Sequence, residues 1–133
     1  MKVIGLDHLV LTVKSIERTV DFYCRILGMT HEVFGPDRRH ALRFGPHKIN
    51  LHQADNMFEP RALHPTMGSG DLCFLVDDIA GVGRQLAAAG IDVLEGPVRR
   101  TGARGQMSSF YVRDPDQNLV ELSAYVDGTR AAS

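Results

Sequence analysis

The 133-residue chain has no tryptophan and only two cysteines, Cys24 and Cys73. Two cysteines without a CxxC spacing provide neither a disulfide framework nor a common zinc motif, so both are expected to be reduced thiols. The chain also lacks an apolar run of membrane-spanning length, and its start, MKVIGLD, has no long apolar signal segment. These absences predict a soluble, cytoplasmic protein with no membrane partner.

The chain has no excess of either charge, since 15 basic and 16 acidic residues give a formal net charge of -1. These residues are spread along the sequence without the basic stripe that nucleic-acid binding requires, so no nucleic-acid partner is expected. Hydrophobic residues make up 44% of the chain. That share is enough for one compact domain, or for two small modules that share a core, and it excludes a disordered chain.

The same order of predicted elements occurs twice. After a strand in GLDHLVLTV, a helix is predicted from Ser15, a suitable N-cap, to Gly28, followed by strands at 29–35, 39–45 and 48–53. The second half repeats this order with a strand at 71–76, a helix at 79–90, and strands at 91–98, 105–114 and 118–125. Superposing HLVLTVKSI on DLCFLVDDI aligns Leu9 with Leu72 at a constant offset of 63 residues.

The repeat predicts an α+β fold made of two βαβββ modules. Residues 1–126 are expected to form one domain, with modules at 1–53 and 70–126 and a connecting loop at 54–69. Residues 127–133 carry little apolar content and are expected to be a frayed tail. The two modules together are expected to form a curved, barrel-like mixed sheet with helices outside and a cavity on its concave face.

Strand alternation predicts that each module has one apolar and one polar face. In the first strand, His8 lies on the face opposite Leu9, Leu11 and Val13, because successive side chains point to opposite faces. An isolated histidine in such a position is most often only hydrogen-bonded to its surroundings. Here the same alternation assigns a whole set of polar residues to the inner face: His8, Arg43, Asn50, His52, Asp71, Ser109, Tyr111 and Glu121.

Four segments of the chain resemble the vicinal oxygen chelate superfamily: DHLVLTV, FYCRILGM, DLCFLVDDI and YVRDPDQNLVELS. This superfamily includes glyoxalase I, extradiol dioxygenases, fosfomycin-modifying transferases and bleomycin-binding resistance proteins. The resemblance covers nearly the whole chain. KINLHQ, FEP, HPTMGSGDLCF and EGPVRRTGARG are more narrowly similar to glyoxalase-domain proteins, some of them labelled virulence-associated.

The resemblance implies one divalent metal ion, Fe, Mn, Ni or Zn, on the concave face. By motif, His8 matches the first-strand histidine of the family and Glu121 its last-strand glutamate. Asp71 stands where a histidine is usual, and Asn50 where glyoxalase I has a glutamate, so the identity of the metal stays open. His52 is either a replacement ligand or a base. Asp71 is a ligand, a cap of its strand or the partner of an arginine.

The activity implied is that of a glyoxalase-like lyase or isomerase acting on a small substrate with adjacent oxygens. The metal acts as a Lewis acid while Glu121 or His52 moves a proton. Four further residues are expected to contact the substrate: Arg43, Asn50, Ser109 and Tyr111. One alternative is an Fe(II) extradiol-type dioxygenase with His8, His52 and Glu121 as ligands. Another is a metal-free protein that sequesters an antibiotic or metabolite.

The resemblance also implies a homodimer whose cavities can include side chains from both subunits, since each module alone leaves a sheet edge exposed. The remaining histidines occupy predicted loop or outer-strand positions and are assigned no role: His31, His40, His47 and His64.

Overall fold

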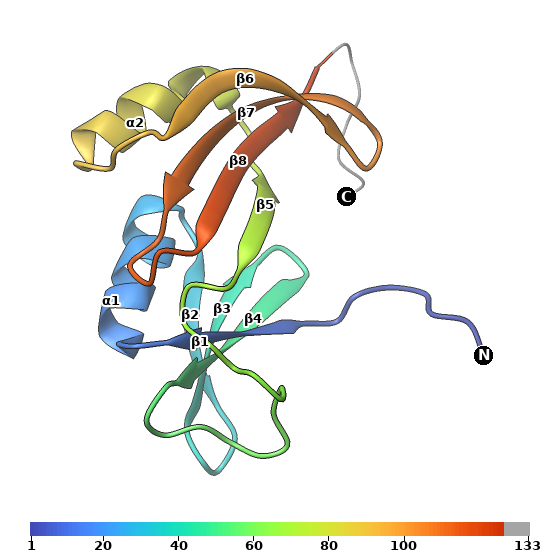
Figure 1. Ribbon diagram of the computed structural model, residues 1–133, viewed down its shortest axis with the longest axis vertical. Helices are drawn as coiled ribbons and strands as arrows, with labels where there is room; N and C mark the ends of the chain where they lie inside the picture. Colours follow the sequence, from blue (N-terminus) through green and yellow to red (C-terminus); the bar gives the residue numbers. More distant parts are fainter. Residues whose placement is uncertain (127–133) are drawn as a thin grey trace. The chain divides into compact units, whose positions relative to one another are not determined.

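The computed structural model describes residues 1–126. The chain divides into two compact units, unit 1 from Met1 to Ser69 and unit 2 from Gly70 onward. Each unit contains one helical segment and one open four-stranded sheet, which confirms the predicted α+β class and the two βαβββ modules (Figure 1). The mixed sheet is thus divided into two four-stranded sheets. The single-domain organisation stays a prediction, and the predicted tail lies outside the described residues.

The sheet of unit 1 has four strands: β1 (Leu9–Val13), β2 (Thr30–Phe34), β3 (Arg39–Phe44) and β4 (His47–Gln53). Their order is β1-β4-β3-β2, with β1 parallel to β4 and the other pairs antiparallel. The helical segment consists of α1 (Ile16–Val20) and a continuing π-helix, η1 (Asp21–Ile26). It begins where the Ser15 hydroxyl accepts the N–H of Arg18 at 3.2 Å, and it ends before Gly28, whose φ is 75°.

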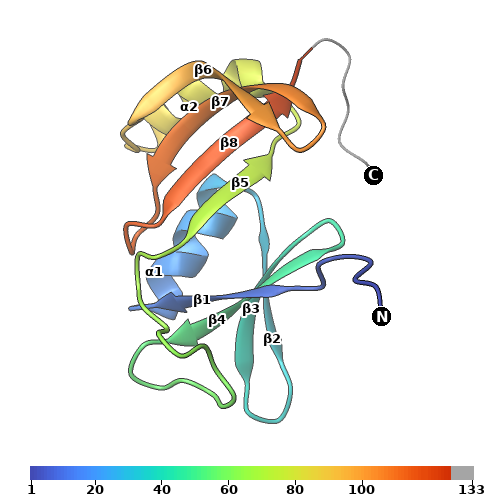
Figure 2. The ribbon, with the colours of Figure 1, turned by 45° about the vertical axis from the view of Figure 1, so that its right-hand side comes forward.

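The apolar face of the first sheet forms the core of unit 1. Its residues Val13, Leu42 and Ile49 are at most 1% exposed, and the helical segment adds Phe22 and Tyr23. Each side chain of this size contributes about 1.5–3 kcal/mol when it is fully buried. Residues 1–8 precede β1 as an exposed segment without regular secondary structure (Figure 2). The core therefore leaves the opposite face of the sheet available for polar side chains.

The sheet of unit 2 repeats this plan with four strands: β5 (Asp71–Leu75), β6 (Glu95–Gly102), β7 (Gly105–Arg113) and β8 (Leu119–Tyr125). Their order is β5-β8-β7-β6, with β5 parallel to β8. The helical segment consists of a 3-10 turn, η2 (Ile79–Gly81), and α2 (Val82–Ala88). Asp78 caps its start by accepting the N–H of Ala80 at 3.1 Å. The duplicated element order predicted from the sequence is confirmed.

The strand predicted at 91–98 lies at 95–102 instead. The N–H of Ile91 donates to the carbonyl of Leu86 at 2.9 Å, so the first predicted strand residue completes the end of the helix. At the other end, the strand continues because Arg99 to Gly102 pair with β7. The apolar run IDVL was therefore a poor guide to where this strand begins.

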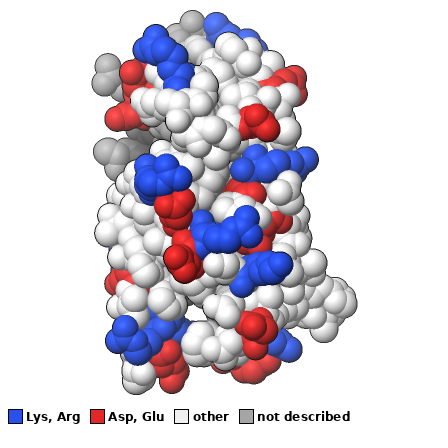
Figure 3. All heavy atoms as spheres, turned by 90° about the vertical axis from the view of Figure 1, so that its left-hand side faces the viewer, with Lys and Arg blue, Asp and Glu red and all other residues white. Residues whose placement is uncertain are grey.

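The described helices, all within residues 1–126, are too short or too polar to cross a bilayer. On the face drawn in Figure 3, basic and acidic side chains are interspersed and do not separate by sign.

Candidate functional site

The polar face of unit 1 is centred on two buried residues of β4. Asn50 is 9% exposed and lies between Val10 of β1 and Ala41 of β3, and His52 is 7% exposed and lies opposite Thr12. Within residues 1–126, the side-chain Oδ1 of Asn50 is buried without a hydrogen-bond partner. Such an atom costs about 1–3 kcal/mol. Asn50 therefore presents an acceptor that the residues around it do not satisfy.

His52 is held as a neutral imidazole. Its ring packs edge-on against Phe58, with 5.7 Å between the ring centroids, and the Arg39 guanidinium lies 4.3 Å from the centre of the Phe58 ring. Burial lowers the pKa of His52, and the positive charges of Arg39 and Arg61 lower it further. A neutral imidazole is the form that can ligate a metal or accept a proton.

His8 lies immediately before β1 and not within it, because the parallel pairing with β4 begins at Leu9 opposite Ile49. Its ring is exposed, and its Nδ1 lies 2.8 Å from Oδ2 of Asp7. The same hydrogen bond lowers the pKa of Asp7. A carboxylate on Nδ1 leaves the Nε2 lone pair facing outward, as in many metal-binding histidines.

Arg43, predicted to contact substrate, has a partner within unit 1. Its Nε lies 2.6 Å from Oε2 of Glu32 on the neighbouring strand β2. Both side chains are partly exposed, so this ion pair contributes little to stability. The pair nevertheless restricts the direction of the Arg43 guanidinium, whose terminal nitrogens stay available to an anionic group.

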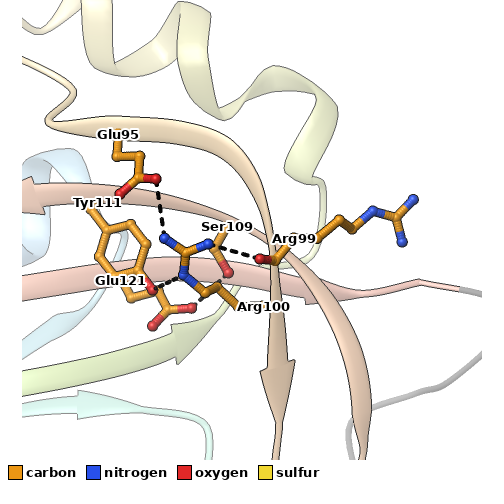
Figure 4. A network of polar contacts seen from close by, with 6 residues as sticks. All are labelled: Glu95, Arg99, Arg100, Ser109, Tyr111 and Glu121. Carbon is orange, nitrogen blue, oxygen red and sulfur yellow. Dashed lines mark hydrogen bonds and ion pairs between the residues drawn. The ribbon is translucent and has the colours of Figure 1, made fainter.

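The polar face of unit 2 is centred on Glu121, which β8 places opposite Cys73 of β5 and Tyr111 of β7. The Ser109 hydroxyl lies 2.6 Å from Oε2 of Glu121 (Figure 4). The Ser123 hydroxyl lies 3.1 Å from the same oxygen and 2.6 Å from the Ser109 hydroxyl. Cys73 Sγ donates to Ser123 at 3.3 Å.

The hydroxyls of Ser109 and Ser123 together have two protons for three contacts: the two with Glu121 and the one between the serines. The shortest contacts are satisfied when Ser123 donates to Ser109 and Ser109 donates to Glu121, which leaves the 3.1 Å contact without a proton. The result is a chain of donors from Cys73 through Ser123 and Ser109 to the carboxylate. Each donated bond polarises the next one and strengthens it. Glu121 is therefore held in one orientation by a fully buried hydroxyl.

Tyr111 connects this carboxylate to a cationic group. Arg100 donates from Nε to the Tyr111 hydroxyl at 3.0 Å, and its terminal nitrogen lies 3.1 Å from Glu95 (Figure 4). Burial raises the pKa of Tyr111; Arg100 opposes that rise and Glu121 adds to it. The phenol therefore stays protonated at neutral pH and can act as a hydrogen-bond donor.

Sequence reasoning missed Arg100 and Glu95. The register of β6 shifts between Glu95 and Val98, so Glu95 lies opposite Tyr111 and Val98 lies opposite Ser109. Regular alternation would place Glu95 and Arg100 on different faces, because one number is odd and the other even. The register shift brings both onto the face of Tyr111. The Gly96-Pro97 pair inside the predicted strand was the available signal.

Asp71 begins β5 and is exposed, opposite Leu119 and two residues before Cys73, the partner of Glu121. Its position is fixed by the preceding residue, because the N–H of Gly70 donates to Oδ1 of Asn118 at 2.7 Å. Asn118 is in turn held by Asp114, the first residue of the Asp-Pro-Asp turn, through bonds of 2.8 and 2.9 Å. That turn therefore sets the start of both β5 and β8.

Within residues 1–126, no group of three histidine, cysteine, aspartate or glutamate side chains lies in position to hold a metal ion. The polar groups of each unit are nevertheless of types that bind a metal ion. Unit 1 presents a neutral imidazole and the unpartnered oxygen of Asn50, and unit 2 presents an oriented carboxylate. Nitrogen and oxygen donors of these types suit Fe(II), Mn(II), Ni(II) and Zn(II).

Comparison with known proteins finds chains of similar sequence. The glyoxalase domain-containing protein RDO1 of Mycosarcoma maydis is 55% identical over 128 residues, covering 96% of this chain and 72% of that protein. Virulence protein STM3117 of Salmonella typhimurium is 52% identical over 122 residues, covering 91% and 84% of the two proteins.

Solved structures agree. The crystal structure of STM3117 superposes with a TM-score of 0.91 at 50% identity and covers 95% of this chain and 100% of that one. An integron cassette protein of V. cholerae gives 0.90 at 51% identity, covering 94% and 98%. The family model named Glyoxalase/Bleomycin resistance protein/Dioxygenase superfamily matches residues 5–122. The resemblance read from the sequence is thereby confirmed, and the chain belongs to the glyoxalase/bleomycin resistance protein/dioxygenase superfamily.

Proposed function

We propose that the protein is a divalent-metal-dependent lyase or isomerase of the glyoxalase type, acting on a small substrate with two adjacent oxygens. The proposal rests above all on the orientation of its two family-matched ligands. Asp7 holds the His8 ring through Nδ1, and Ser109 holds the Glu121 carboxylate through Oε2. Supporting contacts of this kind are what metal ligands require if they are to keep a fixed direction.

His8 and Glu121 would hold the metal, and Asp71 and His52 are the further candidate ligands. The bound ion would supply Lewis-acid stabilisation of developing charge on the substrate oxygens. His52, which is neutral and buried, can accept a proton from the substrate, and Glu121 can do the same.

Substrate positioning falls to the remaining polar groups. The unpartnered Asn50 oxygen accepts a donor of the substrate, and the protonated Tyr111 hydroxyl donates to one of its oxygens. Ser109 acts through Glu121, and Arg43 offers its terminal nitrogens to an anionic group.

The name of the Mycosarcoma maydis relative refers to a glyoxalase domain, which supports chemistry of this class. We also propose that the protein acts as a homodimer. Five apolar side chains of the first ten residues are exposed by 45% or more: Met1, Val3, Ile4, Leu6 and Val10. Exposed apolar side chains that lie this close together favour burial against another chain.

A second candidate is an Fe(II) extradiol-type dioxygenase. The feature that favours it is the lowered pKa of His52, which favours a neutral imidazole, so that with His8 and Glu121 the chain offers two imidazoles and one carboxylate. That donor set is the one used by non-haem Fe(II) oxygenases.

Metal analysis tests the ligand assignment. Protein purified without chelators is compared with His8→Ala, Glu121→Ala and Asp7→Asn, and with His64→Ala, an exposed loop residue, as the matched control. We expect both ligand variants to lose the metal, and Asp7→Asn to weaken its affinity by about tenfold or more. Unchanged occupancy in both His8→Ala and Glu121→Ala would overturn the assignment.

Turnover separates the functions. Metal-reconstituted protein is offered α-ketoaldehyde thiol adducts and catechols, and we expect conversion of an adduct that chelation abolishes. Catechol cleavage with oxygen uptake under Fe(II) would identify the dioxygenase. Tight ligand binding that survives chelation, with no product from any substrate, would replace both enzymatic proposals with a sequestering protein.

A further inference from the structure

His31 and His40 form a close imidazole pair on unit 1. The antiparallel register of β2 and β3 sets His31 opposite Leu42 and Val33 opposite His40, so the two histidines are diagonal neighbours on one face. Their rings are nearly parallel, at 8°, with 5.1 Å between centroids. Nε2 of His31 lies 2.8 Å from Nδ1 of His40.

This face is opposite the one that carries Asn50 and His52. His40 pairs with Leu51 of β4, whereas Asn50 pairs with Ala41, and neighbouring strand positions point to opposite sides. The imidazole pair is therefore separate from the residues of the proposed catalytic function, and a role for the pair does not depend on that function.

The pair lines a cavity of about 630 Å³ in unit 1, whose wall is formed by polar and apolar side chains. The other residues around this cavity are Lys14, Ser15, Ile16, Glu17, Val20 and Gln53. The cavity is large enough for a hydrated metal ion or a small ligand. Glu17 and Gln53 are among the residues that line it, and both carry side-chain oxygens, the type of group that hydrogen-bonds to water ligands of a metal ion.

The contact between the two rings requires a free lone pair on one of the facing nitrogens. One ring must donate and the other accept in a contact between two ring nitrogens, so the pair loses its hydrogen bond if both rings are fully protonated. Burial lowers the pKa of His40, and the neighbouring positive charges of His31 and Arg38 lower it further.

We propose that His31 and His40 form a second, bidentate site for a transition-metal ion, with water in the remaining coordination positions. Nitrogens 2.8 Å apart, each about 2.0–2.1 Å from a metal, enclose an angle of about 90° at the ion. That angle matches adjacent positions of square-planar or tetragonal Cu(II) and Ni(II), whereas a tetrahedral ion needs about 3.3 Å between the nitrogens. Binding requires the donor ring to move its proton to its other nitrogen, so that both facing nitrogens offer a lone pair to the ion, which lies to one side of the line between them.

Cu(II) titration of the untagged, metal-stripped full chain tests this site. Calorimetry measures the affinity, and paramagnetic broadening of amide NMR signals locates the ion. The variants are His31→Asn and His40→Asn, and the control is His64→Asn, which removes an exposed loop imidazole. Thermal unfolding confirms that each variant is folded, and if one is not, the other still tests the site.

We expect Cu(II) to broaden the signals of Glu17, His31 and His40 in the wild-type protein. Each of the two variants should bind Cu(II) at this site about tenfold or more weakly. Mutation of a residue that only hydrogen-bonds to a ligand already costs about 10- to 100-fold in metal affinity. His64→Asn should bind as the wild type does. Wild-type affinity and broadening in both His31→Asn and His40→Asn would overturn the proposal. Broadening confined to signals of Asn50, His52 and Glu121 would overturn it as well.

Discussion

Replacing Ser109 with alanine tests the donor chain that orients Glu121. The Ser109 hydroxyl is fully buried, and at 2.6 Å it makes the shortest contact to the carboxylate. A hydrogen bond to a charged group contributes about 1.5–3 kcal/mol. Ser123 already lies 3.1 Å from the same oxygen and can donate to it once Ser109 is gone. That exchange restores part of the loss, so we expect the free energy of unfolding to fall by about 1–2 kcal/mol.

Ser123→Ala should cost less, about 0.5–1.5 kcal/mol, because it removes a neutral bond and leaves the contact between Ser109 and Glu121 intact. Ser108→Ala is the matched control, since Ser108 neighbours Ser109 on β7 but lies outside the donor chain; its effect should stay within about 0.5 kcal/mol.

Urea denaturation measures all three variants, and metal titration measures their affinity for the ion. If the proposed metal site is correct, Ser109→Ala should also weaken metal binding by about tenfold, because the carboxylate loses its orientation. Equal unfolding free energies for Ser109→Ala and Ser108→Ala would refute the donor chain. The reverse ranking of Ser109→Ala and Ser123→Ala would refute the proton assignment within it.

Two further predictions concern pH and assembly. Because burial lowers the pKa of His52 in the folded state, the unfolded chain binds more protons as the pH falls below about 6.5, so metal-free protein should lose stability there. When the pH is lowered through that value, the urea midpoint should fall less for His52→Asn than for His64→Asn. Equal falls in the two variants would contradict the burial effect. Light scattering at working concentration should give the mass of two chains, which Leu6→Glu should shift toward one; a single-chain mass for the wild type would contradict the proposed dimer.

The sequence by itself determined the duplicated architecture. Apolar residues at period two in the strands and at helical spacing between them, bounded by Ser15 and Gly28, specify βαβββ, because burial of one face needs only local alternation and capping signals. The same alternation correctly placed Asn50 and His52 on one face of their strand, and Glu121 and Tyr111 on a common face of theirs. Local periodicity suffices wherever the strand is regular.

Tertiary structure alone decided which polar groups contact each other. The contacts of Glu121 with Ser109 and Ser123 depend on strand register and rotamers, which no spacing in one strand encodes. The irregularity in β6 reversed the parity of Glu95 and brought Arg100 to Tyr111. The imidazole pair of His31 and His40 arose from residues that sequence reasoning had left without a role. Two side chains nine residues apart meet there because an antiparallel pairing makes diagonal neighbours of distant positions, and that pairing exists only in the folded sheet.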